Sequence, residues 1–152
     1  MKNRISIRKA AADDAEPIAE FNIAMAMETE QKKLERDRIE PGVKALFDHP
    51  EYGFYLVAES GDEIIGSLMV TKEWSDWRNG LFWWIQSVYV IPEFRRKGVY
   101  RAMYEKVKQL ADQAENVCGF RLYVEKENTI AQQTYLSLGM DETHYKMFEE
   151  IN

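Results

Sequence analysis

A short basic segment near the middle of the chain has the residue types and spacing to bind a phosphate group. It reads Arg95, Arg96, Lys97, Gly98, and the apolar run before it stops at Pro92. Apolar periodicity predicts a helix directly after the glycine, and backbone N–H groups at a helix start have no internal acceptor. The glycine removes a Cβ that would obstruct phosphate oxygens, and the cations add charge, so the segment predicts a diphosphate site. The alternative is a basic helix terminus that only complements nearby acidic groups.

The elements on either side would hold this segment between a strand and a helix. Residues 81–91 form the longest apolar run and predict a central strand, which the helix after Gly98 follows. Residues 120–124 predict a further strand, and the helix after it is capped by Asn128 and ended by Gly139. We expect the first of these helices to cross over between two parallel strands in the usual right-handed sense.

The remainder of the chain predicts two helices and four more strands. Asp13 or Asp14 is expected to cap a first helix. Pro41-Gly42 is expected to separate it from a short second helix that ends near Pro50. Strands are expected at residues 4–8, 54–59, 63–73 and about 144–149. This order favours an α/β (α+β) fold with a mixed, mostly antiparallel sheet and helices on both faces.

Size and composition limit the possible classes of protein. The 152 residues suit a single domain over residues 1–152, and 45% hydrophobic with 30% charged residues are ordinary globular values. A net charge of −6 argues against a nucleic-acid binder, and one cysteine with two histidines gives no metal-ligand spacing. There is no signal-peptide pattern and no run of about 20 apolar residues, so we expect a cytoplasmic protein that binds no membrane.

Two segments resemble the cofactor-binding motifs of one enzyme superfamily. Arg95 and Gly98 match the acetyl-coenzyme A signature of the GNAT acetyltransferases, an Arg or Gln, two residues, Gly, one residue, then Gly or Ala. Tyr100 stands where the small residue is commonest. Residues 128–140 resemble the family's later cofactor-contacting helix, with Asn128 as its cap. The resemblance implies a GNAT-like sheet of six to seven strands in which a central strand pair splays apart and pantetheine pairs with the exposed backbone.

The resemblance also implies acetyl-CoA as cosubstrate and assigns roles to residues. The cofactor-binding residues would be Val88, Tyr89, Val90, Arg95, Arg96, Lys97, Gly98, Val99, Tyr100, Arg101 and Asn128. Tyr135 matches the family's general-acid tyrosine, which protonates or hydrogen-bonds the departing thiolate. The other interpretation of Tyr135 is a tyrosine that packs in the core. A backbone N–H near Val90 would polarise the thioester carbonyl.

The general base and the acceptor site are expected at other positions. Several amine-acetylating relatives carry a glutamate where this chain has Gln86, and because an amide accepts no proton, a water chain to a carboxylate would replace it. The candidate carboxylates are Glu28, Glu30 and Asp76. The candidate acceptor-site residues are Glu28, Glu30, Trp74, Asp76, Trp77, Trp84 and Gln86. An acidic run is more often a solvated helix face, unless its carboxylates line a cleft, and the aromatic residues suit either an ammonium pocket or a dimer interface. Trp83 and Trp84 are predicted to point to opposite faces of their strand.

These observations predict an N-acetyltransferase that moves an acetyl group from acetyl-CoA to a primary amine, preferably a small polar or cationic one. A protein N-terminus or lysine is an alternative acceptor. A non-catalytic module that binds CoA and regulates a partner would keep the cofactor motif around Gly98 without needing Tyr135 or a general base. A third alternative is an interaction protein whose aromatic surface contacts another chain. We expect a monomer or a homodimer.

Overall fold

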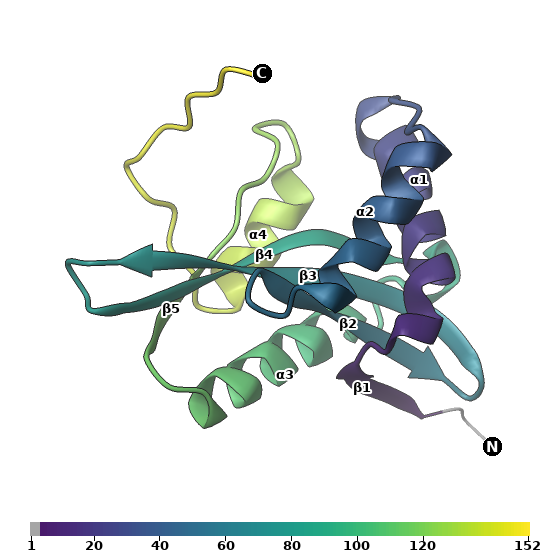
Figure 1. Cartoon of the computed structure of the whole chain (residues 1–152), viewed down its shortest axis with the longest axis horizontal. Coiled ribbons are helices and arrows are strands. Elements are labelled where there is room, and N and C mark those ends of the chain that lie inside the picture. The colour runs from purple at the N-terminus through teal and green to yellow at the C-terminus, as the bar shows by residue number, and fades with distance from the viewer. Residues whose placement is uncertain (1–3) are drawn as a thin grey trace. The chain divides into compact units, whose positions relative to one another are not determined.

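A mixed five-stranded sheet organises the chain up to Leu122 in the computed structural model, which describes residues 4–152 (Figure 1). Its strands follow chain order and are β1 Ile5–Lys9, β2 Gly53–Ser60, β3 Glu63–Ser75, β4 Gly80–Val90 and β5 Val117–Arg121. The first three pairings are antiparallel, whereas β4 and β5 are parallel. The mixed, mostly antiparallel sheet is confirmed, with five strands in place of the six to seven expected.

Helices cover both faces of this sheet, as expected (Figure 1). α1 Ala15–Glu30 and α2 Arg36–Asp48 lie on one face, and α3 Val99–Gln113 lies on the other. α3 connects the parallel strands β4 and β5, which confirms the predicted crossover helix. α4 Thr129–Ser137 belongs to a second compact unit, Tyr123–Asn152. Within residues 4–152, no helix has the length and apolar character that crossing a membrane requires.

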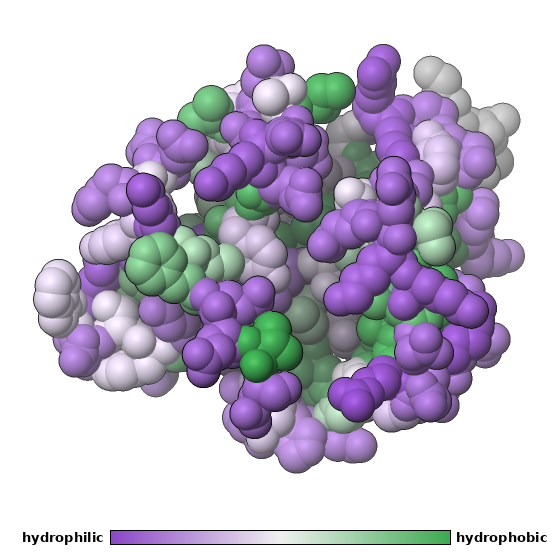
Figure 2. Space-filling model, turned by 90° about the horizontal axis from the view of Figure 1, so that it is seen from above, coloured by the Kyte–Doolittle hydropathy of each residue, from purple (hydrophilic) through white to green (hydrophobic). Residues whose placement is uncertain are grey.

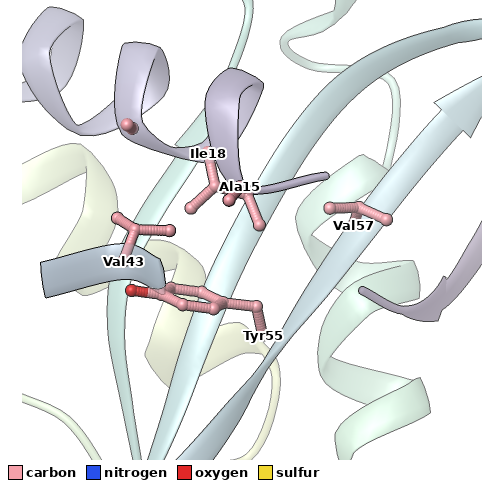
Figure 3. Close-up of a cluster of buried hydrophobic side chains, with 6 residues drawn as sticks. Ala15, Ile18, Val43, Tyr55 and Val57 are labelled. Carbon is pink, nitrogen blue, oxygen red and sulfur yellow. The ribbon is translucent and has the colours of Figure 1, made fainter. Parts of the chain in front are cut away.

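Small and branched side chains and the ring of Tyr55 fill the core between α1, α2 and the sheet (Figure 3). The buried members are Ala15, Ile18, Ala19, Val43, Tyr55 and Val57. Burial raises the pKa of the Tyr55 phenol to about 12, because the interior disfavours the phenolate. Tyr55 and Val57 of β2 face these helices, and Met69 of β3 packs against the same cluster. Because side chains alternate along a strand, these residues define the sheet face that carries α1 and α2.

The second helix begins earlier than the sequence suggested. A break was expected at Pro41-Gly42, but α2 starts at Arg36 and passes through both residues. The reason is an apolar face at helical spacing that packs against the core, formed by Ile39, Val43, Leu46 and Phe47. Burying this face outweighs the backbone hydrogen bond that proline cannot donate.

Two strand predictions differ from the structure. Residues 144–149 form no strand among the described residues, and Phe148 there is 92% exposed. Alternation of side chains does not supply the neighbouring backbone that a strand must pair with. β5 begins and ends three residues earlier than the expected 120–124. Gly119 lies inside β5, because a Cβ at that position would lie 2.7 Å from Cε1 of Phe82 and only glycine fits beneath the ring.

Candidate functional site

The turn between β4 and α3 has a backbone geometry that favours glycine. Gly98 is the N-cap of α3 with a φ of 79°, and Arg96 has a φ of 62°, so both are left-handed. A residue with a Cβ is strained in this conformation, which explains the glycine. Apart from the neighbouring residues of the chain, no atom of the described residues lies within 4 Å of the place where a Cβ on Gly98 would stand. The turn is therefore open beside the start of α3.

The first turn of α3 leaves backbone donors pointing out of the helix. Its first hydrogen bond joins the Ala102 N–H to the Gly98 carbonyl at 3.0 Å. The N–H groups before Ala102 have no acceptor inside the helix, and among the described residues no side chain caps it. Three exposed cations surround this turn, namely Arg96, Lys97 and Arg101. The donors and charges fit a diphosphate group.

The residues that follow Gly98 hold α3 against the sheet. Val99 is 2% exposed and belongs to the core. The Tyr100 ring stacks on Tyr104 one turn later, with centroids 6.2 Å apart and planes inclined by 9°. The large side chain at the position where a small residue was expected therefore lies along α3, over the following turn.

Arg95, the first residue of the basic segment, ties the end of β4 to α1. Its Nε donates to the Val90 carbonyl at 2.8 Å, and Nη2 donates to the Glu28 carboxylate at 2.9 and 3.2 Å. Its guanidinium carbon lies 5.3 Å from the centre of the Tyr89 ring, which packs on Phe21 of α1. Burial and the charge of Glu28 raise the pKa of the Tyr89 phenol. Glu28, a candidate acceptor residue, thus has Arg95 as its partner.

β4 extends beyond its parallel partner. The pairing with β5 ends at the pair Trp84↔Arg121, whereas β4 continues to Val90. No strand of the described residues pairs with this last part of β4 on the β5 side. The splayed central pair is therefore present as a length of β4 whose edge is not paired with any strand of the described residues.

A bulge in β4 determines which of its backbone groups face away from β3. Ser87 has a φ of 52°, and the register with β3 shifts at this point. Beyond the bulge the Ile91 N–H donates to the Ile65 carbonyl at 2.9 Å, and Tyr89 pairs with Ser67. Because backbone groups alternate along a strand, those of Val88 and Val90 face away from β3. The Val90 carbonyl already accepts from Arg95, and the Val90 N–H lies on the same unpaired edge. Of the three residues expected to offer backbone groups, Val88 and Val90 face the appropriate side.

A polar row follows β3 and β4 on the face that carries α1 and α2. Gln86 Nε2 donates to Thr71 Oγ1 at 2.6 Å, and Trp84 Nε1 donates to Glu73 Oε1 at 2.7 Å. Met69 pairs with Gln86 and packs against the core under α1 and α2, so the polar row lies on the sheet face that carries these helices. Two of the candidate acceptor residues, Trp84 and Gln86, are therefore adjacent.

The polar row ends in an ion pair with β5. Arg121 Nη1 donates to Glu73 Oε1 at 3.1 Å and lies 3.4 Å from Oε2. The guanidinium carbon is 3.6 Å from the centre of the Phe82 ring, so the group lies flat against it. The side chains of Arg121 and Glu73 are 25% and 43% exposed. The backbone of Arg121 forms the last pair with β4, and its side chain lies over Phe82, two residues back along β4 from that pair.

The structure separates the other acceptor candidates from this row. Trp83 is 5% exposed and Trp84 is half-buried on the other face, which confirms their opposite directions. Trp74 alternates with Glu73 and lies on the face of Trp83. Asp76 and Trp77 lie in the exposed β3–β4 turn, and Glu30 is the exposed last residue of α1. On the face that Figure 2 shows, hydrophilic residues predominate and hydrophobic ones are scattered.

The second unit carries the remaining predicted residues. Asn128 caps α4 through Oδ1, which accepts from the Ala131 N–H at 3.2 Å. Gly139 follows α4 with a φ of 98°, so both predicted ends of this helix are confirmed. Tyr135 is half-buried, and burial raises the pKa of its phenol.

Sequence reasoning missed Glu73 and Arg121. Glu73 follows Lys72 near the end of β3, Arg121 is the last residue of β5, and neither lies in a motif. The signal that unites them is the cross-strand register, in which Glu73 pairs with Phe82 and Arg121 with Trp84.

Comparisons with known proteins agree with this geometry. The model of the acetyltransferase (GNAT) family matches residues 16–140. The crystal structure of a possible acetyltransferase from Clostridium difficile 630 is 49% identical, with a TM-score of 0.90 and 97% of each chain covered. The comparison with curated proteins gives no match.

Two more distant structures share the fold. An aminoglycoside N-acetyltransferase, AAC(6')-Iy in complex with CoA, is 16% identical, with a TM-score of 0.77 and 99% of this chain and 97% of that chain covered. A ribosomal-protein-alanine N-acetyltransferase from Brucella melitensis biovar Abortus 2308 is 12% identical, with a TM-score of 0.79 and 98% and 100% covered.

Proposed function

Because the chain belongs to the GNAT acetyltransferase family, we propose that it transfers the acetyl group of acetyl-CoA to the primary amine of a small polar or cationic molecule. The observation that carries the proposal is the open turn at Gly98, with outward N–H groups beside three exposed cations. The aminoglycoside acetyltransferase among the structural neighbours gives independent support for a small amine as acceptor. A protein N-terminus or lysine is the alternative acceptor.

Different residues of this chain would bind different parts of the coenzyme. Arg96, Lys97, Arg101 and the amides at the start of α3 would hold the diphosphate, while Arg95 keeps the turn attached to β4. The outward backbone groups of Val88 and Val90 would pair with pantetheine, and the Val90 N–H would donate to the thioester oxygen. Asn128 caps the helix that carries Tyr135. When bound, acetyl-CoA supplies an activated acyl group.

In the transfer one bond forms and one breaks, the amine loses a proton, and the thiolate gains one. The neutral amine nitrogen forms a bond to the acetyl carbon, and the C–S bond breaks. The nitrogen then loses a proton through water, and the departing thiolate takes one from Tyr135, which water reprotonates. The Tyr135 phenol, whose pKa burial raises, is protonated at neutral pH and therefore carries the proton that the thiolate takes.

Thermal shift with acetyl-CoA followed by thiol release on an amine and peptide panel tests the proposal. At a hundredfold excess over the dissociation constant, the coenzyme should add about 2.7 kcal/mol to the free energy of unfolding and raise the midpoint by roughly 5–10 °C. Gly98→Val should abolish the shift. Gly61→Val, which strains another left-handed glycine in the β2–β3 turn, should retain it.

Turnover then separates the functions that remain. Tyr135→Phe should lower kcat at unchanged coenzyme affinity, and turnover unaffected by this change would remove the proposed acid. A thermal shift without turnover on any amine or peptide would favour a CoA-binding regulator. No shift at all would refute the proposal.

A further inference from the structure

The edge of β3 that faces β2 lacks a neighbouring strand near the β3–β4 turn, which extends past β2 (Figure 1). β2 begins at Gly53, which pairs with Thr71, so no strand of the described residues lies on this side of β3 from Lys72 onward. The register of the two strands would place Pro50 opposite Trp74, and proline has no N–H to donate to a ladder. The edge of β3 is therefore open from Lys72 to the turn.

The backbone of Trp74 faces this open edge. Leu81 pairs with Trp74, and the Leu81 N–H donates to the Asn116 carbonyl at 2.7 Å, on the side of β4 away from β3. In such an antiparallel pair both residues turn their backbone groups outward, so the N–H and C=O of Trp74 point away from β4. Because the direction alternates along a strand, the backbone of Lys72 points the same way. An open edge of this kind pairs with another chain unless it is blocked.

The side chains along this edge are apolar at its centre and oppositely charged at its ends. Trp74 is 57% exposed, and Trp77 in the adjoining turn is 88% exposed. Lys72 and Asp76 lie at equal separations on either side of Trp74, so the three side chains are expected to share one face. A lysine normally protects an open edge by its charge, but an aspartate on a second copy can neutralise it. The edge is therefore complementary to its own reversed copy.

We propose that the open β3 edges of two copies of this chain pair antiparallel about a two-fold axis at Trp74 and make the protein a homodimer. The two Trp74 backbones exchange both hydrogen bonds, and Lys72 of each copy lies opposite Asp76 of the other. This register uses the open edge completely and ends where β2 begins. A register centred on Glu73 would instead place two Glu73 carboxylates opposite each other, which is destabilising.

The dimer interface is separate from the site of the proposed function. The β3–β4 turn lies at the Gly80 end of β4, whereas the turn at Gly98 follows the Val90 end. Dimerisation therefore neither requires acetyl-CoA nor depends on the acetyl transfer.

Sedimentation velocity over a series of protein concentrations tests the association. Because the shared edge is short, the interface should bury less than about 1,200 Å², and the dimer should dissociate on dilution. A protein that is still monomeric at about 1 mM, where even a complex with a millimolar dissociation constant is partly formed, would refute the proposal.

Charge reversal tests the register. Lys72→Glu and Asp76→Lys each turn two opposite-charge pairs into two like-charge pairs, so each should raise the dissociation constant of the dimer about tenfold. The double variant restores opposite charges in reverse order and should return the constant to within about threefold of the original. Asp62→Lys is the matched control, because it makes the same charge change at the exposed β2–β3 turn, and it should have no effect. A dimer that neither single variant weakens, or that the double variant does not restore, would refute this register.

Hydrogen exchange of the Trp74 amide distinguishes a second copy from any other occupant of the edge. Pairing between copies predicts that the protection of this amide rises with protein concentration and is lost in Lys72→Glu. Protection that is the same at every dilution would mean that the chain covers its own edge, and it would refute the proposal. A dimer in which the Trp74 amide exchanges freely would place the interface elsewhere and would refute the proposal as well.

Discussion

Each edge strand of the sheet carries an arginine with carboxylate partners, and the two guanidinium groups are held differently. On β1, Arg8 donates to both Asp14 oxygens at 2.8 and 3.0 Å and from Nε to Glu59 at 2.5 Å. On β5, Arg121 donates from one nitrogen to one carboxylate and rests on a ring. All three nitrogens of Arg8 are thus engaged with two carboxylates, which suits it to hold chain segments together. Among the hydrogen bonds of the described residues Arg121 uses Nη1 alone, so a single carboxylate and the Phe82 ring hold it.

Arg95 is intermediate between the two. It donates from Nε to the Val90 carbonyl and from Nη2 to Glu28, so it joins α1 to the phosphate turn with two of its nitrogens. Its side chain is 43% exposed, close to the 41% of Arg8. The number of donors engaged, more than exposure, therefore distinguishes the three arginines.

The largest effect on stability is expected at Arg8. Arg8→Gln leaves the Asp14 carboxylate, whose side chain is only 10% exposed, with the Ala11 N–H as its remaining partner. We expect a loss of about 2 kcal/mol in the free energy of unfolding, less than for a fully buried pair because Arg8 is partly solvated. Urea unfolding measures it. Arg121→Gln should cost less than about 1 kcal/mol, and a larger cost there would make Arg121 a structural residue like Arg8.

The sequence predicts most of the scaffold because local periodicity and turn chemistry agree with it. The apolar run at 81–91 becomes β4, and Gly98 marks the start of α3 through a left-handed φ. Failures occur where contacts distant in the chain override local signals. The core that Ile39 and Val43 join carries α2 through Pro41.

In the candidate site, too, the local part is predictable from the sequence and the non-local part is not. The turn from Arg95 to Gly98 is contiguous, so its residues are recognisable in the sequence. The pairing of Glu73 with Arg121 depends on two strand registers, each of which contains a shift, and one residue of slippage would move either side chain to the other face. The bulge at Ser87 that turns Val88 and Val90 toward the exposed edge has no sequence signal of its own, because serine rarely adopts a left-handed φ.

A smaller effect, visible only in acid, is expected from Asp14. Hydrogen bonds from Arg8 hold the pKa of its carboxyl below the ordinary 3.8. The unfolded chain therefore binds the proton first, so this contribution to stability is complete above pH of about 4 and is lost as the pH falls through the native pKa. Asp14→Asn removes the contribution and should flatten the acid limb of a plot of unfolding free energy against pH. An unchanged limb would show that other carboxylates cause acid unfolding.

The smallest effect is expected where Arg95 meets Glu28. Both side chains are more than 40% exposed, so Glu28→Gln and Arg95→Gln should each lower stability by about 0.5 kcal/mol. The double variant should cost little more than either one, because each single change already breaks the same bond. Strictly additive costs would mean that the ion pair contributes nothing. Repeating the cycle with saturating CoA shows whether Arg95 holds chain segments together, as Arg8 does, or binds the coenzyme. Since the Val90 carbonyl anchors Nε, we expect the coupling to persist, and its disappearance would mean that the guanidinium leaves Glu28 for the diphosphate.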